Sequence, residues 1–144
     1  MTKEQLLPQL FFRESHTNKL VSPTFDALGS IDPIMFQEWQ NSKRELVLAD
    51  VADTHWVKTC TEGYITEVVF HADGALNEYR LFDRFETQGR WFLADGILHV
   101  EIIKGENRYS FGVIGNADVN IHSAVEYKND ELHSYLKLAQ IKPN

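Results

Sequence analysis

The pattern of hydrophobic and polar positions changes near residue 52 of this 144-residue chain. Before that point, apolar side chains recur at helical spacing or in no regular order. Beyond it they alternate with polar ones on a two-residue period, and turn-forming residues interrupt the alternation every eight to twelve residues, as in strands that bury one face. We therefore predict a single domain, residues 1–144, with a helical or irregular N-terminal segment at residues 1–51 and a β segment at residues 52–144.

The β segment contains eight predicted strands, which cover residues 54–61, 64–71, 75–83, 89–94, 97–104, 108–115, 119–128 and 131–141. Asp73-Gly74 and Asp95-Gly96 are typical of two-residue hairpin turns, whose central positions need φ above zero. Because every connection is short, consecutive strands should pair antiparallel. An open meander of this length would expose both of its edges. We therefore predict a mainly β fold in which about eight strands form an up-and-down meander that closes into a barrel.

One or two N-terminal helices should pack on the barrel. Thr2 and Gln5 resemble a capping box at the start of the first helix, which Pro8 should shorten or kink. The second helix should run from residue 33 to about residue 42, with an extension to residue 48 left open, because Asp32 can cap it and proline fits its first turn. Its apolar face, which we expect to close over one end or edge of the barrel, contains Met35, Phe36 and Trp39.

Between these helices, residues 15–30 are rich in Ser, Thr, Pro and Gly and are typical of a loop. The net charge of −7 disfavours binding to nucleic acid, because phosphate would be repelled. No apolar run approaches the roughly 20 residues of a membrane span. The N-terminus lacks the basic and apolar regions of a signal peptide, and the single cysteine, Cys60, fits a reducing compartment. We therefore expect a cytoplasmic protein that binds neither nucleic acid nor membrane.

The β segment also shows a rhythm of an early tryptophan, an Asp-Gly hairpin and then Gly-x-Trp-x-Leu-x-Asp-Gly-x-Leu. The stretches that carry it are Asp53-Thr54-His55-Trp56, Phe70-His71-Ala72-Asp73-Gly74 and Gly89-Arg90-Trp91-Phe92-Leu93-Ala94-Asp95-Gly96-Ile97-Leu98. Over roughly the last two-thirds of the chain, this rhythm resembles the calycin superfamily, which includes lipocalins, fatty-acid-binding proteins and bacterial lipocalin-like domains. The resemblance implies a lipocalin-like barrel with a cavity for a small apolar or aromatic molecule.

Aromatic side chains make up 12% of the chain, and most of them lie in predicted strands. An eight-stranded barrel either fills its interior with side chains or holds one small ligand. The rings therefore either fill the barrel or line a pocket, and the sequence leaves both interpretations open. The candidate ligand-binding residues are Trp56, Tyr64, Tyr79, Trp91, Tyr109, Phe111 and Tyr127, with Phe82 in the same aromatic set.

Two groups of charged residues offer further candidates. His99 and Glu101 lie two residues apart, a spacing that could serve metal binding or acid–base chemistry, but they alternate with Val100 and should face solvent. A second group should form charge pairs on the outer face, or else turn one arginine inward toward a ligand carboxylate; it contains Glu67, Glu78, Arg80 and Arg90. We find no phosphate-binding, nucleophile or metal motif, so we predict no metal and no cofactor and assign no catalytic residue.

Three functions are compatible with these features. The one that we favour is a module that binds a small apolar or aromatic ligand inside the barrel. The first alternative is an enzyme that acts on a small molecule there, with His, Glu, Arg or Tyr as acid–base groups. The second is an interaction or assembly module that uses the second helix or an open sheet edge, for which a homodimer would be the expected form.

Overall fold

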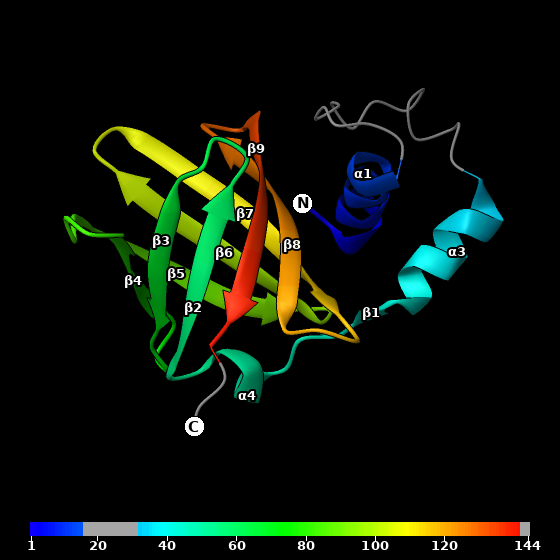
Figure 1. Ribbon diagram of the computed structural model, residues 1–144, viewed down its shortest axis with the longest axis horizontal. Helices are drawn as coiled ribbons and strands as arrows, with labels where there is room; N and C mark the ends of the chain where they lie inside the picture. The colour runs from blue at the N-terminus through cyan, green and yellow to red at the C-terminus, as the bar shows by residue number, and fades with distance from the viewer. Residues whose placement is uncertain (16–31, 142–144) are drawn as a thin grey trace.

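Eight antiparallel strands form a closed barrel in the computed structural model, which describes residues 1–15 and 32–141 (Figure 1). The strands are β2 (Thr54–Cys60), β3 (Ile65–Phe70), β4 (Ala75–Arg80), β5 (Glu86–Ala94), β6 (Ile97–Lys104), β7 (Asn107–Asn116), β8 (Ile121–Lys128) and β9 (Glu131–Gln140). Each pairs with the next, and β9 pairs back with β2, which closes the sheet. The predicted up-and-down barrel is confirmed. The predicted loop at residues 15–30 lies, apart from Ser15, outside the described residues.

The connection between β4 and β5 differs most from the prediction. The strand expected to reach residue 83 ends at Arg80, and the next begins at Glu86 rather than at Gly89. Between them, Phe82 and Arg84 have positive φ values of 75° and 59°. Residues other than glycine rarely adopt this backbone conformation. The alternation of hydrophobic and polar positions gives no signal for it.

The two Asp-Gly turns have different geometries. At Asp95-Gly96 both residues have positive φ, 55° and 73°, as a two-residue hairpin requires. At Asp73-Gly74 only the glycine does, with φ of 96°. The connection there is four residues long, because β3 ends at Phe70 and β4 begins at Ala75. The two-residue hairpin predicted at that position is therefore wrong.

Helix α1 (Lys3–Ser15) packs against the outside of the barrel beside β8 (Figure 1). Its buried leucines meet outward-facing strand residues in a cluster of Leu6, Leu7, Leu10, Ile97, Ile114 and Val125. A Cβ atom on Gly112 would lie 2.8 Å from Leu6 Cδ1, so glycine allows this close approach. Pro8 lies inside the 13-residue helix, which is longer than predicted. We attribute this to the burial of the leucines around it, which offsets the hydrogen bond that proline removes.

Helix α3 (Pro33–Asn41) begins as predicted, with Asp32 Oδ1 accepting the backbone N–H of Ile34 at 2.8 Å. Its aromatic residues Phe36 and Trp39 meet the ring of Phe11 edge-on, at 5.2 and 5.5 Å between centroids. The expectation that this helix closes over an end or edge of the barrel is wrong, because its aromatic face finds an apolar partner on α1 instead.

One barrel end is closed by the segment after α3, which contains β1 (Lys43–Arg44) and α4 (Leu48–Val51). Strand β1 pairs with β7, and Leu46 and Val51 join the apolar core next to Trp56. In Figure 1, α4 lies beneath the end at which β2 begins and β9 finishes. None of the helices in residues 1–15 and 32–141 combines the length and apolar character needed to cross a bilayer.

Candidate functional site

The barrel interior is apolar in its middle and polar toward both ends. The buried apolar residues of the strands are Trp56, Val68, Phe70, Leu76, Trp91, Leu98, Val100, Ile102, Phe111, Val113, Ala124, Leu136 and Leu138. Every second residue of a strand faces the interior. Toward both ends of the barrel, these inward-facing positions are occupied by polar side chains. The two ends of the barrel therefore have to be compared by the partners of these polar groups.

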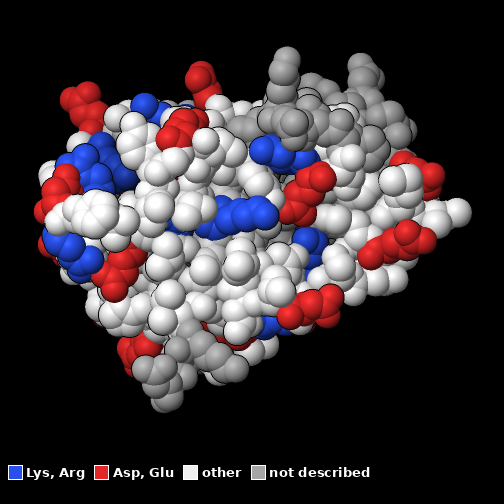
Figure 2. Space-filling view, in the orientation of Figure 1, with Lys and Arg blue, Asp and Glu red and all other residues white. Residues whose placement is uncertain are grey.

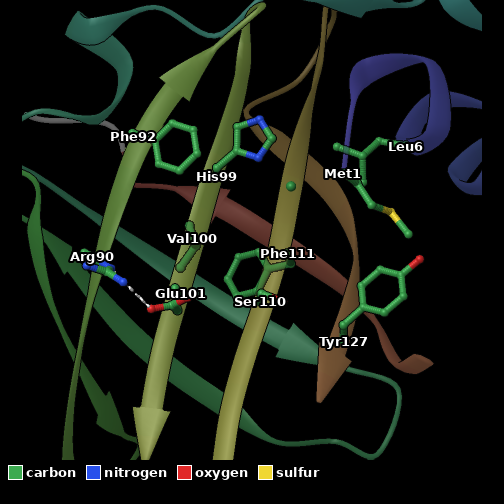
Figure 3. Close-up of a pocket in the computed structure, with 11 residues that line it drawn as sticks. Met1, Leu6, Arg90, Phe92, His99, Val100, Glu101, Ser110, Phe111 and Tyr127 are labelled. Carbon is green, nitrogen blue, oxygen red and sulfur yellow. Dashed lines mark hydrogen bonds and ion pairs between the residues drawn. The ribbon is translucent and has the colours of Figure 1, made fainter. Parts of the chain in front are cut away.

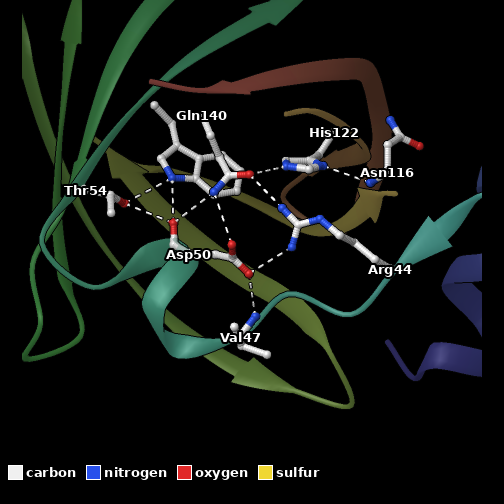
Figure 4. A network of polar contacts seen from close by, with 8 residues as sticks. Arg44, Val47, Asp50, Thr54, Asn116, His122 and Gln140 are labelled. Atoms are coloured by element: carbon white, nitrogen blue, oxygen red, sulfur yellow. Dashed lines mark hydrogen bonds and ion pairs between the residues drawn. The ribbon is translucent and has the colours of Figure 1, made fainter. Parts of the chain in front are cut away.

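At the end near α4, the inward polar groups form a continuous hydrogen-bond network (Figure 4). We call it the closed-end network; it contains Arg44, Asp50, Trp56, His122 and Gln140. The Asp50 carboxylate accepts from Arg44 Nη1 at 3.0 Å and from the backbone N–H of Val47 at 2.8 Å. Gln140 Oε1 accepts from Arg44 Nη2 at 3.0 Å, and Trp56 Nε1 donates to the Asp50 carbonyl at 3.2 Å. These bonds tie the segment that contains β1 and α4, which we call the plug, to β2 and β9.

His122 is fully buried in this network and has a defined tautomer. Its Nδ1 accepts the backbone N–H of Asn116 at 2.9 Å, so Nε2 carries the hydrogen and donates to Gln140 Oε1 at 2.6 Å. Burial lowers the pKa of His122, and the positive charge of Arg44 acts in the same direction, against the bond to Gln140. The imidazole is thus neutral and its ring nitrogens are both engaged, which marks it as a structural residue.

The opposite end of the barrel opens into a cavity of about 740 Å³, which we call the open-end cavity. It lies among the β2–β3, β4–β5, β6–β7 and β8–β9 connections. Its inner wall is polar and contains Lys58, Thr66, Lys104, Glu126 and Ser134. Its outer rim is mostly aromatic and aliphatic and contains Tyr64, Ile65, Leu81, Phe82 and Tyr109. Its size and mixed lining are those of small-molecule sites.

Glu78 anchors the inner wall of the cavity and is saturated with partners. Lys58 Nζ lies 2.6 Å and Lys104 Nζ 3.2 Å from its carboxylate. The hydroxyls of Thr66 and Thr87 donate to the same carboxylate at 2.8 and 3.1 Å. Burial alone would raise the pKa of Glu78, but the attraction and hydrogen bond of Lys58 outweigh it and lower the pKa to about 2. Glu78 is therefore a fixed negative charge.

Glu126 faces the same cavity from β8 but has no such partners. It is 5% exposed, and no described residue donates a hydrogen bond to it. The nearest nitrogen atoms of basic side chains, Lys58 Nζ and His133 Nε2, lie 3.8 and 3.9 Å from its carboxylate. Burial raises the pKa of Glu126, opposed first by the charge of Lys58. Its carboxyl group is thus free to bind something in the cavity.

The rim of the cavity is exposed and conformationally strained. Phe82 and Tyr64 are 91% and 70% exposed. Phe82 also has the positive φ noted above, in a loop that Arg80 and Asp83 hold through an ion pair of 2.7 Å. Strained backbone and exposed rings cluster at ligand-binding loops more often than elsewhere. The rim therefore offers an apolar entrance to a polar inner wall.

The structure distributes the predicted aromatic residues among three environments. Trp56 and Trp91 are buried in the core, and their N–H groups donate to the carbonyls of Asp50 and His71. Tyr64, Tyr109 and Phe82 line the open-end cavity. Phe111 faces the interior beneath Lys58, with Nζ 5.4 Å from its ring centre.

The other two predicted aromatic residues lie outside the barrel. Tyr79 lies on the outer face of β4, where its hydroxyl donates a hydrogen bond to Glu86 at 3.4 Å. Tyr127 reaches α1, where its hydroxyl donates to Gln9 at 2.7 Å. Neither residue borders the open-end cavity.

His99 and Glu101 lie on the outer face, as predicted. They border a groove of about 440 Å³ between α1 and the sheet, in which His99 stacks on Phe92 at 4.7 Å (Figure 3). Glu101 pairs with Arg90 at 3.0 Å and with Arg108 at 3.4 Å. The two candidate residues therefore have separate partners in this groove.

The charged candidates divide between the two faces of the sheet. Glu67 and Arg90 form outer-face ion pairs, as predicted. The outer placement of Glu78 is wrong, because it shares the inward row of Leu76. Arg80 lies at the cavity mouth and pairs with Asp83. Figure 2 shows acidic and basic side chains interspersed over the visible face, with no continuous patch of one sign.

Sequence reasoning missed Lys58, Glu78 and Glu126 as interior residues. The signal was the two-residue period: Lys58 follows the inward Trp56 by two positions, and Glu126 follows the inward Ala124 by two. Charged residues rarely face the interior unless they are paired. Because charged residues are generally expected to face solvent, the polar wall of the cavity was not predicted. Within residues 1–15 and 32–141, no group of three or more His, Cys, Asp and Glu side chains is arranged to hold a metal ion.

The chain matches no protein-family model, no curated protein sequence and no solved structure. The barrel and its open-end cavity are therefore the features that bear on function.

Proposed function

We propose that this protein binds a small molecule with an apolar or aromatic body in the open-end cavity. The observation that carries the proposal is a cavity of about 740 Å³ with an apolar rim and a polar inner wall, at the one end of the closed barrel that α4 does not cover. Such a cavity orients a ligand by burying its apolar part and pairing a few polar atoms. The proposal makes the barrel a carrier or sensor of its ligand.

The barrel also supports a place for this chain among lipocalin-like domains of the calycin superfamily. The support is the eight-stranded, up-and-down, closed topology together with the tryptophan and Asp-Gly rhythm of the sequence. A cytoplasmic location belongs to the same proposal, and the single cysteine in the chain supports it.

Cys60 offers a direct test, because it borders the cavity and is the only cysteine of the chain. We expect phenylbutanol to slow the alkylation of Cys60 by iodoacetamide in a saturable way. The control is the double variant Cys60→Ser/Thr59→Cys, which moves the only thiol to the outward neighbour on β2. Its alkylation should not respond to the ligand. Alkylation of Cys60 that stays unchanged at every ligand concentration would contradict the proposal.

A second candidate function, an enzyme, is favoured by one specific observation. Glu126 lines the cavity and Glu78 lies behind its wall, with Lys58 near both carboxyl groups. Their pKa values are displaced in opposite directions, an arrangement that suits acid–base chemistry. Mass spectrometry of a metabolite mixture before and after incubation separates the two functions. A binding protein returns its ligand unchanged, whereas an enzyme depletes one compound and produces another, and the variant Glu126→Gln should abolish that conversion.

A further inference from the structure

The free carboxyl group of Glu126 is the least satisfied polar group that the interior presents to the cavity. Within the described residues, every buried side-chain nitrogen or oxygen that is closed off from solvent has a hydrogen-bond partner. The Glu126 oxygens have none, although the side chain is only 7% exposed. They must therefore open onto the cavity, where a ligand can reach them.

The two lysines of the inner wall do not donate a hydrogen bond to Glu126. Lys58 and Lys104 both direct their ammonium groups at Glu78, at 2.6 and 3.2 Å. Lys58 reaches Glu126 only at 3.8 Å, beyond hydrogen-bond distance. A buried carboxylate without hydrogen bonds is unfavourable, and a donor supplied by a ligand would relieve that cost.

The charges around the cavity favour a cationic ligand over an anionic one. The cavity is lined by three cationic side chains, Lys58, Arg80 and Lys104, and by the carboxylates of Glu62, Asp83 and Glu126. Behind this wall, Glu78 pairs with both lysines, so the set of seven groups holds one more negative than positive charge. An incoming cation would bring this set to neutrality, whereas an anion would add to the excess of negative charge. The nearest group to Glu126 outside this set, His133, carries a charge only when it is protonated.

We infer that the ligand of the open-end cavity is an amine, whose ammonium group donates a hydrogen bond to Glu126 while its apolar or aromatic body lies against the rim. This inference rests on the proposed function and names the chemical class of its ligand. The exposed ring of Phe82 supplies a face that suits both an aromatic body and a positive charge. A charge-assisted bond to a buried carboxylate is stronger than a neutral one, so Glu126 sets the preference.

The test compares three probes with the same body, phenylbutylamine, phenylbutanol and phenylbutyric acid, by isothermal titration calorimetry on the full chain. We expect the amine to bind at least about tenfold more tightly than the acid, with the alcohol between them. In the variant Glu126→Gln the advantage of the amine should disappear, while binding of the alcohol should persist. The variant Glu131→Gln, an exposed carboxylate on the adjacent strand, should behave like the unmodified chain.

A measurement on the unmodified protein keeps the test independent of how the variants fold. Acidification protonates Glu126. The affinity for the amine should therefore decrease as the pH is lowered, whereas the affinity for the alcohol should stay the same. The other titratable groups that act on Glu126 are Lys58, Lys104, His133 and Glu78. Glu78, whose pKa is about 2, stays ionised at any pH well above that value.

Two results would overturn the inference while leaving the proposed function in place. One is tighter binding of the acid or the alcohol than of the amine, and the other is an undiminished preference for the amine in Glu126→Gln. If none of the three probes binds and none protects Cys60, the proposed function fails together with the inference.

Discussion

The two ends of the barrel both hold charged side chains but use them differently. At the closed end, the carboxylate of Asp50, the imidazole of His122 and the amide of Gln140 all have hydrogen-bond partners within the protein. At the open end, Glu78 is equally satisfied but Glu126 is not. A satisfied network stabilises a unique structure, whereas an unsatisfied buried group weakens it unless a ligand supplies the partner. The satisfied end therefore stabilises the fold, and the end with the unsatisfied carboxyl group is the one at which we propose binding.

The largest expected effect comes from the ion pair that holds the inner wall of the cavity. Lys58→Met should lower the free energy of unfolding by about 3–5 kcal/mol, because it leaves the buried carboxylate of Glu78 short of its closest partner. Urea denaturation measures the change. Lys137→Met, on the exposed face of β9, should cost little. A loss below about 1 kcal/mol for Lys58→Met would show that the pair contributes little, as at an exposed site.

The same pair predicts how stability depends on acid. The pKa of Glu78 is about 2 in the folded protein and 4.5 in the absence of its partners. Because the folded value is the lower one, its contribution is present above pH 4.5 and is lost as the pH falls toward 2. We expect a loss of about 3 kcal/mol from this group. Urea denaturation across this range should show a much shallower pH dependence for Glu78→Gln, and equal slopes would contradict the assignment.

At the closed end, Gln140→Leu should be destabilising without affecting binding. It removes the acceptor of His122 Nε2 and of Arg44 Nη2, and leaving buried donors unpaired costs about 1–3 kcal/mol. The protection of Cys60 by phenylbutanol should be unchanged in this variant. Loss of protection in a folded Gln140→Leu would mean that the two ends are coupled.

The smallest effect on the free energy of unfolding is expected at Glu126, where a substitution should stabilise the protein. Burial raises the pKa of Glu126, so its unfavourable contribution is present at neutral pH and absent below its unfolded value of 4.5. Glu126→Gln should therefore stabilise the protein by about 1 kcal/mol at pH 7, and the gain should vanish near pH 4. Thermal denaturation at both pH values measures this. Destabilisation of equal size at both would indicate a structural role.

The barrel was predictable from the sequence because its signals are local. The alternation of Leu98, Val100 and Ile102 and the Asp95-Gly96 turn need no tertiary information. The plug at α4 was not predictable, since it depends on contacts from Leu46 and Val51 to strands far along the chain.

The candidate site was only partly predictable. Tyr64 and Tyr109 were expected to line a pocket and do border the cavity. The roles of Lys58, Glu78 and Glu126 depend on three strands meeting inside a closed barrel, which a one-dimensional pattern does not contain. The open end of the barrel is the one that the N-terminal segment does not cover. The sequence of the β segment alone gives no signal for which end that is.

The most direct test of the account is a map of where a ligand binds, obtained from ¹H–¹⁵N NMR spectra recorded during titration with phenylbutylamine. We predict that the backbone amides with the largest shifts belong to the open end, around Tyr64, Phe82, Tyr109 and Glu126. Those of the closed-end network, such as His122, should hardly move. Shifts centred on the closed end, or on the outer groove beside His99, would contradict the assignment of the open-end cavity as the binding site.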